Sequence, residues 1–184
     1  MNQFVFADPN LCIGCTTCTI ACVISHQQGS DYELTEKSFV PRLTVIKNLD
    51  VSTPVLCRQC DDAPCAQVCP NNAIISEDNH IKVIQERCIG CKTCVVACPY
   101  GAMTVVTTTV AKGAESSLFK AEKQTSQALK CDLCAHSDDG PACVRVCPTN
   151  ALRLVTSEDL DQMNKKKQLA AASAAGDVIS FEYF

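Results

Sequence analysis

Cysteine dominates the composition of this chain. Sixteen of its 184 residues are cysteine, tryptophan is absent and aromatic residues make up only 5%. The 47% hydrophobic share counts these cysteines, so few side chains remain for an ordinary core, and something besides packing must stabilise the fold. The length allows one compact domain or two small halves. A net charge of −4, with no long basic stripe, excludes nucleic acid as an expected partner.

The start of the chain and its hydropathy predict a cytoplasmic protein. The first residues, MNQFVFADPN, contain no charged region, no apolar run and no twin arginine, so no export signal is expected. No stretch approaches 18 apolar residues, so a membrane-spanning helix is not expected either. Disulfides are rare in the cytoplasm, where clustered cysteines more often bind metal.

The predicted elements are short and alternate with runs of cysteine. Where apolar and β-branched residues gather, strands are expected over residues 2–7, 40–48, 81–85, 102–109 and 151–155. The short apolar run that follows Cys69 and Pro70, in CPNNAII, is expected to form another strand. Brief helices carry the Cys-x3-Cys pairs, and the first of them lacks a following proline and is expected to run to about Gly29. Residues 30–54 and 107–130 contain no cysteine. A polar helix is expected from Ser157, as its N-cap, to Gly176. The predicted fold class is α+β.

The sixteen cysteines form four runs of four, numbered here as quartets one to four. Quartet one reads C-x2-C-x2-C-x3-C, and its members are Cys12, Cys15, Cys18 and Cys22. Quartet two reads C-x2-C-x4-C-x3-C-P, and its members are Cys57, Cys60, Cys65 and Cys69. Quartet three repeats the first spacing, with Cys88, Cys91, Cys94 and Cys98. Quartet four reads C-x2-C-x8-C-x3-C-P, with Cys131, Cys134, Cys143 and Cys147.

This spacing favours iron-sulfur clusters. Three closely spaced thiolates can ligate three iron corners of a 4Fe-4S cluster, and in the bacterial run the fourth cysteine ligates the other cluster of a pair. Quartets are therefore expected to act in twos. A disulfide framework would require an oxidising compartment. Structural zinc sites, the other alternative, separate their C-x2-C pairs by a spacer, whereas a Cys-Pro ends three of these four runs.

Other motifs carry less information. The three histidines, His26, His80 and His136, show no spacing typical of a metal site, so surface or capping roles are expected. No nucleophile-base pair, phosphate-binding loop or dinucleotide motif is present, and a non-catalytic protein is expected. Cations beside the cysteines could raise a cluster's potential by favouring the added electron, and Lys92 is the preferred candidate. The full set is Arg58, Arg87, Lys92, Lys130 and Arg145.

The order of the quartets resembles a known family. It is similar to the four-cluster ferredoxin-like electron-transfer subunits that partner molybdenum or tungsten oxidoreductases of the dimethyl sulfoxide reductase superfamily. The stretches FADPNLCIGCTTC and KCDLCAHSDDGPACVRVCPTNAL resemble its cytoplasmic formate dehydrogenase branch, which includes subunits of formate hydrogenlyase and hydrogen-dependent carbon dioxide reductase. The resemblance covers residues 3–156 and implies four 4Fe-4S clusters in this chain.

The resemblance also implies which cysteines share a cluster. Site 1 would take Cys12, Cys15, Cys18 and Cys147. Site 2 would take Cys57, Cys60, Cys65 and Cys98. Site 3 would take Cys88, Cys91, Cys94 and Cys69. Site 4 would take Cys131, Cys134, Cys143 and Cys22. The implied architecture is a tandem bacterial-ferredoxin-like fold with two pseudo-twofold cluster pairs. Its parts are an outer pair in residues 1–30 plus 128–156, an inner pair in residues 55–106, and a helical tail in residues 157–184.

The expected function is to relay electrons between a molybdenum or tungsten formate dehydrogenase catalytic subunit and a hydrogenase, a second iron-sulfur subunit or another acceptor. One alternative is the same role beside another molybdopterin oxidoreductase, such as a polysulfide, nitrate-type or sulfoxide reductase. Another is an assembly role, in which the C-terminal tail docks neighbouring protomers, as in a filament. A tail that packs on its own domain is the simpler interpretation.

Overall fold

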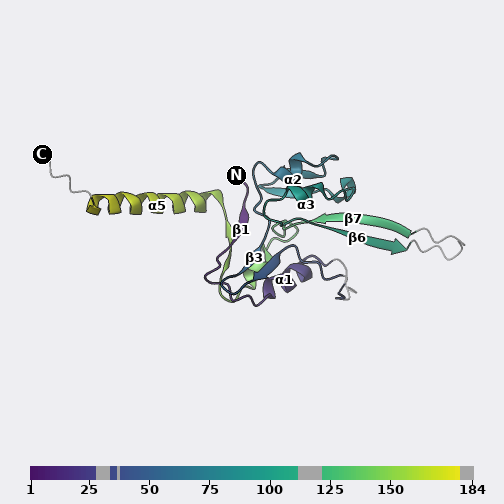
Figure 1. The fold of residues 1–184 in the computed structure, drawn as a ribbon, viewed down its shortest axis with the longest axis horizontal. Helices are drawn as coiled ribbons and strands as arrows, with labels where there is room; N and C mark the ends of the chain where they lie inside the picture. Colours follow the sequence, from purple (N-terminus) through teal and green to yellow (C-terminus); the bar gives the residue numbers. More distant parts are fainter. Residues whose placement is uncertain (28–33, 37, 112–121, 179–184) are drawn as a thin grey trace, which may run out of the picture.

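Most helices and strands of the fold are short. The computed structural model describes residues 1–27, 34–36, 38–111 and 122–178 (Figure 1). In chain order the elements are β1 (Phe4–Ala7), α1 (Thr17–Ser25), β2 (Thr44–Lys47), β3 (Ser52–Val55), α2 (Pro64–Gln67), β4 (Ile74–Glu77), β5 (His80–Val83), a 3-10 turn (Gln85–Arg87), α3 (Thr93–Ala97), β6 (Thr104–Ala111), β7 (Glu122–Leu129), α4 (Ala142–Arg145), β8 (Leu152–Val155) and α5 (Ser157–Val178).

The described strands form four two-stranded antiparallel sheets. Three are hairpins: β2 with β3, β4 with β5, and β6 with β7. The fourth joins strands far apart in sequence, because β1 pairs with β8 so that Phe4 lies opposite Val155 and Ala7 opposite Leu152. This pairing brings quartets one and four to the same part of the molecule.

Two buried clusters of side chains form the interior. The first centres on Val5, Leu43 and Leu56 and contains cysteines of quartets one and four. The second centres on Ile74, Ile81 and cysteines of quartets two and three. Helix α1 packs against α4, and α2 packs against α3. The α2–α3 pair and α1 lie on opposite sides of the body (Figure 1).

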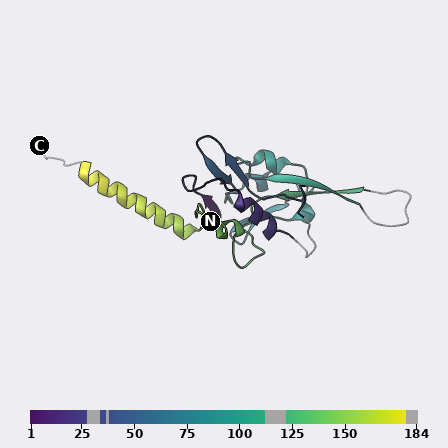
Figure 2. The ribbon, with the colours of Figure 1, turned by 90° about the horizontal axis from the view of Figure 1, so that it is seen from below.

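Helix α5 projects from the body in both views, on the side opposite the β6–β7 hairpin (Figures 1 and 2). Its N-cap is Thr156, one residue before the predicted Ser157. The Thr156 amide donates to Asp159 Oδ2 at 2.9 Å, and the Asp159 amide donates back to Thr156 Oγ1 at 3.3 Å, which is a capping box. None of the helices in the described part of the chain combines the length and apolar character needed to cross a membrane.

Strands β3 and β7 are not predicted from the sequence, and helix α1 is shorter than predicted. Strand β4 forms where the apolar run of CPNNAII predicts a strand. β7 lies in the cysteine-free segment 107–130, where no strand is predicted beyond residue 109, yet it pairs along its whole length with β6 on a hairpin that extends from the body. Helix α1 ends at Ser25 rather than near Gly29, which lies outside the described residues. His26 Nδ1 donates to the Cys22 carbonyl at 2.7 Å at this C-terminus.

Candidate metal centres

All sixteen cysteines are free thiols. Two of the implied sets surround cavities of similar size. The cavity of site 1 has a volume of about 20 Å³, and the cysteines lining it are Cys12, Cys15, Cys18 and Cys147. The cavity of site 3 also has a volume of about 20 Å³, and the cysteines lining it are Cys69, Cys88, Cys91 and Cys94. In both cases three thiols come from one quartet and the fourth comes from another.

The other two sets are also brought together. A cavity of about 20 Å³ corresponds to site 2, and the cysteines lining it are Cys57, Cys60, Cys65 and Cys98. At site 4, burial raises the pKa of Cys143, and the neighbouring thiols of Cys131, Cys134 and Cys22 raise it further. Four thiols around one small space are the donor set that a 4Fe-4S cluster requires. The residues present therefore fit such a cluster.

Electrostatic interactions between cysteines of different sets, and the packing of two helices, indicate the spatial order of the sets. The charge of Cys18, of site 1, also raises the pKa of Cys143, of site 4. Burial raises the pKa of Cys131, again of site 4, to about 12, and Cys57 of site 2 raises it too. Sites 2 and 3 adjoin through the packing of α2 against α3. The order along the molecule is therefore site 1, site 4, site 2 and site 3.

A left-handed residue follows three of the four last cysteines. Asn72, Gly101 and Asn150 each stand three residues after a Cys-Pro cysteine, with φ of 47°, 62° and 53°. Their amides donate to the carbonyls of those cysteines at 3.2–3.3 Å. Asn and Gly are the residues that adopt this conformation most readily, which explains the repeated pattern Cys-Pro-x-Asn/Gly-Ala. The turn lets the chain leave the site immediately, whereas Cys22, without a proline, stays inside α1.

Quartets one and three repeat each other in detail. The residues after their second cysteines, Thr16 and Lys92, have φ of 64° and 66°. The next residues are both threonines. Thr17 Oγ1 donates to Cys15 Sγ at 3.4 Å, and the matching bond from Thr93 to Cys91 measures 3.2 Å. These bonds lower the pKa of both thiols. These two threonines are not among the residues identified from the sequence. The pattern that could have found them is the Thr-Cys pair shared by CTTC and CKTC.

The ends of this row of sites are open to solvent. Cys15 of site 1 and Cys91 of site 3 are exposed, whereas all three site 4 cysteines of quartet four lie deeper. Beside them Ile13 is 67% exposed and Ile89 61% exposed, each within a Cys-Ile-Gly-Cys loop. Sites 1 and 3 therefore each have a ligand at the protein surface.

A hairpin covers each of these two loops at its glycine. A Cβ on Gly14 would meet Ser52 Oγ at 3.0 Å, and a Cβ on Gly90 would clash with the Ser126 side chain. Both glycines have positive φ, 67° and 69°. Glycine is therefore needed at both positions, for backbone conformation and for space.

Gly90→Ala is expected to destabilise the protein at site 3 by more than the positive φ of residue 90 alone would cause. The positive φ costs about 1–2 kcal/mol for an L-residue, and the clash with Ser126 adds to this. Gly140→Ala is the matched control, because Gly140 has φ 73° and nothing within 4 Å of the added Cβ. Thermal unfolding of the two iron-loaded variants measures the difference, and equal midpoints would contradict the predicted clash.

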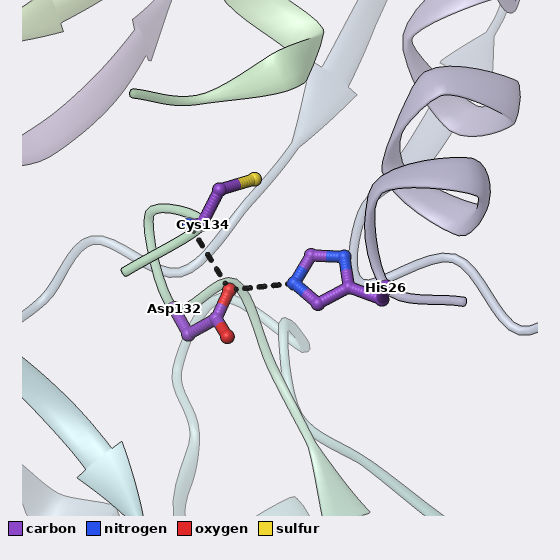
Figure 3. A group of neighbouring side chains, drawn as sticks. All are labelled: His26, Asp132 and Cys134. Atoms are coloured by element: carbon purple, nitrogen blue, oxygen red, sulfur yellow. Dashed lines mark hydrogen bonds and ion pairs between the residues drawn. The ribbon is translucent and has the colours of Figure 1, made fainter. Parts of the chain in front are cut away.

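Three neighbouring residues could in principle hold a single metal ion: His26, Asp132 and Cys134 (Figure 3). His26 Nε2 donates to Asp132 Oδ1 at 2.9 Å, and the Cys134 amide donates to the same oxygen at 3.2 Å. Arg42 pairs with the other carboxylate oxygen. Burial alone would lower the pKa of His26, but Asp132 and Cys22 raise it to about 10. The carboxylate is thus already neutralised by cations, and the group is best described as an ion-pair network beside site 4.

The remaining histidines have roles other than those of a metal set. The rings of His136 and His26 meet in an edge-type arrangement, with 4.7 Å between their centroids. His80 is buried, and its Nδ1 donates to the Asp78 carbonyl at 3.2 Å. His80 is therefore not at the surface, and the capping interpretation suits it better.

The cations beside the ligands differ in burial. Lys92, the preferred candidate from the sequence, is exposed, as are Arg58, Arg87 and Arg145. Water screens such charges strongly. Lys130, by contrast, is 3% exposed. The structure therefore favours Lys130 over Lys92 as the cation that acts on the clusters.

Comparison with known proteins identifies the family. Residues 50–157 match a family described as a 4Fe-4S dicluster domain, and residues 9–22 match a 4Fe-4S binding domain. The electron transport protein HydN of Escherichia coli is 52% identical over 94% of this chain and 98% of its own length. The chain belongs to the ferredoxin-type 4Fe-4S proteins. Formate hydrogenlyase subunit 2 of Escherichia coli is 38% identical over 99% of the chain and 96% of its own length.

Membership in this ferredoxin-type family supports an electron-transport role. Hydrogenase-4 component A of Escherichia coli, 39% identical over 94% of the chain and 92% of its own length, is a further relative. The expected iron-sulfur chemistry and the mixture of short helices and small sheets are confirmed at the level of the family. The names of the electron transport relatives are consistent with a carrier that performs no bond chemistry.

Proposed function

We propose that this ferredoxin-type protein holds four 4Fe-4S clusters, one at each of sites 1 to 4, and relays electrons along that order. The observation that supports this most is the set of three cavities, each lined by three cysteines of one quartet and one of another. The residues grouped at site 4 complete the series. A 4Fe-4S cluster supplies a one-electron couple. The protein fixes the thiolates, covers the inner sites and leaves the outer ones accessible.

The domain arrangement belongs to the same proposal. Sites 1 and 4 would form the outer ferredoxin-like pair in residues 1–30 plus 128–156, and sites 2 and 3 the inner pair in residues 55–106. The pairing of β1 with β8 and the presence of two separate buried clusters support this division. Sites 1 and 3 would then be the terminals, because they lie at the two ends of the row and each has an exposed cysteine.

The partners follow from the resemblance and from the names of the relatives. We place the chain among the iron-sulfur subunits that serve the dimethyl sulfoxide reductase superfamily, between a molybdenum or tungsten formate dehydrogenase and a hydrogenase or another acceptor. Relatives named as a formate hydrogenlyase subunit and a hydrogenase-4 component support this choice. A reducing compartment such as the cytoplasm suits the free thiols.

Anaerobic purification of the native complex from its source cells tests the choice of partner. We expect a molybdopterin-containing subunit to co-purify, and formate to bleach the visible absorption of the clusters. Bleaching by hydrogen would identify the hydrogenase side. Reoxidation by polysulfide, nitrate or a sulfoxide, without any response to formate, would favour another molybdopterin oxidoreductase and overturn the formate assignment.

An assembly role of α5 is the second candidate. The helix projects from the body, its side chains from Asp161 to Ala174 are exposed, and they include Met163 at 47% and Leu169 at 70%. Residues 179–184 of the tail lie outside the described residues. Deletion of residues 157–184 followed by measurement of particle size tests this role, and an oligomer of unchanged size would reject it.

A further inference from the structure

One buried lysine lies between two of the proposed sites. Lys130 follows β7 and directly precedes Cys131 of site 4, and it also lines the cavity of site 2. It is 3% exposed. Its Nζ donates to the Cys131 carbonyl at 2.8 Å and to Gln59 Oε1 at 3.2 Å. A lysine at this degree of burial is rare unless a negative charge compensates it.

No carboxylate forms an ion pair with Lys130 within the described part of the chain. The ion pairs found there involve other cations, and both acceptors of Lys130 are neutral. Burial raises the pKa of Cys65, of site 2, and of Cys131, of site 4, and the positive charge of Lys130 opposes both rises. Lys130 therefore acts electrostatically on thiols of both sites.

Gln59 fixes the position of this ammonium. Its side chain is 1% exposed and stands between Cys57 and Cys60 of site 2. Its Nε2 donates to the Cys131 carbonyl at 2.7 Å, while its Oε1 accepts from the Ile81 amide at 2.9 Å as well as from Lys130. The Ile81 bond determines which end of the amide faces the lysine. The polar side-chain atoms of Gln59 and Lys130 thus all have hydrogen-bond partners. These hydrogen bonds connect the loop of site 2 to the loop of site 4.

We propose that Lys130, held by Gln59, is the buried cation that raises the reduction potentials of sites 2 and 4, so that an electron arriving from either terminal site is stabilised in the central pair. This rests on the proposed function. One electron leaves one site and enters its neighbour, no bond forms or breaks, and Lys130 keeps its protons. A buried positive charge stabilises the added negative charge more than an exposed one does, because little water screens it.

Redox titration of the iron-loaded protein, followed by electron paramagnetic resonance, tests the proposal. Lys130→Met removes the charge and keeps much of the side chain's length. We expect the midpoint potentials of two of the four clusters to fall. Each fall corresponds to about a tenfold change in the equilibrium constant for reduction, which is about 59 mV for one electron. Lys130→Arg keeps the charge and should restore both midpoints. Lys92→Met, at an exposed position beside a site 3 ligand, is the control and should shift them far less.

The outcomes separate this proposal from the proposed function. A wild-type protein without four clusters would defeat the function itself. Given a full iron content, unchanged midpoints in Lys130→Met, or a shift no larger than in Lys92→Met, would overturn the role of Lys130. If Lys130→Met fails to hold iron, Lys130→Gln retains an N–H donor for the Cys131 carbonyl without the charge. Loss of iron in that variant too would assign Lys130 to assembly and overturn its electrostatic role.

Discussion

Anaerobic removal of iron with a chelator is expected to abolish the cooperative thermal unfolding of this protein. Seven of the 22 buried hydrophobic side chains among the described residues are cysteines, and both buried clusters contain them. The described sheets have only two strands each, and isolated two-stranded sheets are marginally stable in water. In such proteins the free energy of metal binding is largely the free energy of folding.

Calorimetry and hydrogen exchange measure this effect. The iron-free protein should show no thermal transition, and the amides of β1 and β8 should lose protection, because that sheet closes on the cysteines of quartets one and four. Anaerobic reconstitution with iron and sulfide is the control and should restore both signals. An iron-free protein that kept its transition would show that packing alone holds the fold.

Paired cysteine substitutions are expected to reveal the crossed arrangement of ligands. Under the proposed assignment, Cys69→Ala with Cys91→Ala removes two ligands of site 3 alone, so three intact cubane clusters should remain. Cys91→Ala with Cys98→Ala removes one ligand each from sites 3 and 2, so only two should remain. Mössbauer spectroscopy counts the intact clusters in each variant.

The two variants are matched controls for each other, since both contain Cys91→Ala and each adds one half-buried cysteine that closes a Cys-x3-Cys pair. If each quartet held its own cluster, the counts would be reversed, because Cys91 and Cys98 belong to quartet three. Three clusters in the Cys91/Cys98 variant, with two in the Cys69/Cys91 variant, would therefore reject the crossed assignment.

The cysteine sites could be predicted because their geometry is encoded locally. Three of the four cysteines around each cavity stand within one run, and the left-handed turns at Asn72 and Asn150 follow from the residue type that the turn requires. The fourth cysteine comes from a different run, and spacing suggests this only by analogy with bacterial ferredoxins.

Other features depend on how distant parts of the chain meet. Lys130 is one of five cations beside the cysteines, and its sequence neighbours do not distinguish it from Lys92. It becomes buried because Gln59 and Ile81, about 50 to 70 residues earlier, close over it. Strand β7 is polar, and its pairing partner β6 rather than its own pattern makes it a strand.

Iron and acid-labile sulfide, measured per polypeptide in protein purified without oxygen, test the central claim most directly. Four cubane clusters require about sixteen of each, and the sixteen free cysteines are the number of ligands that four clusters use. We predict values close to sixteen for both. Stoichiometric zinc with little iron and no sulfide would contradict the account.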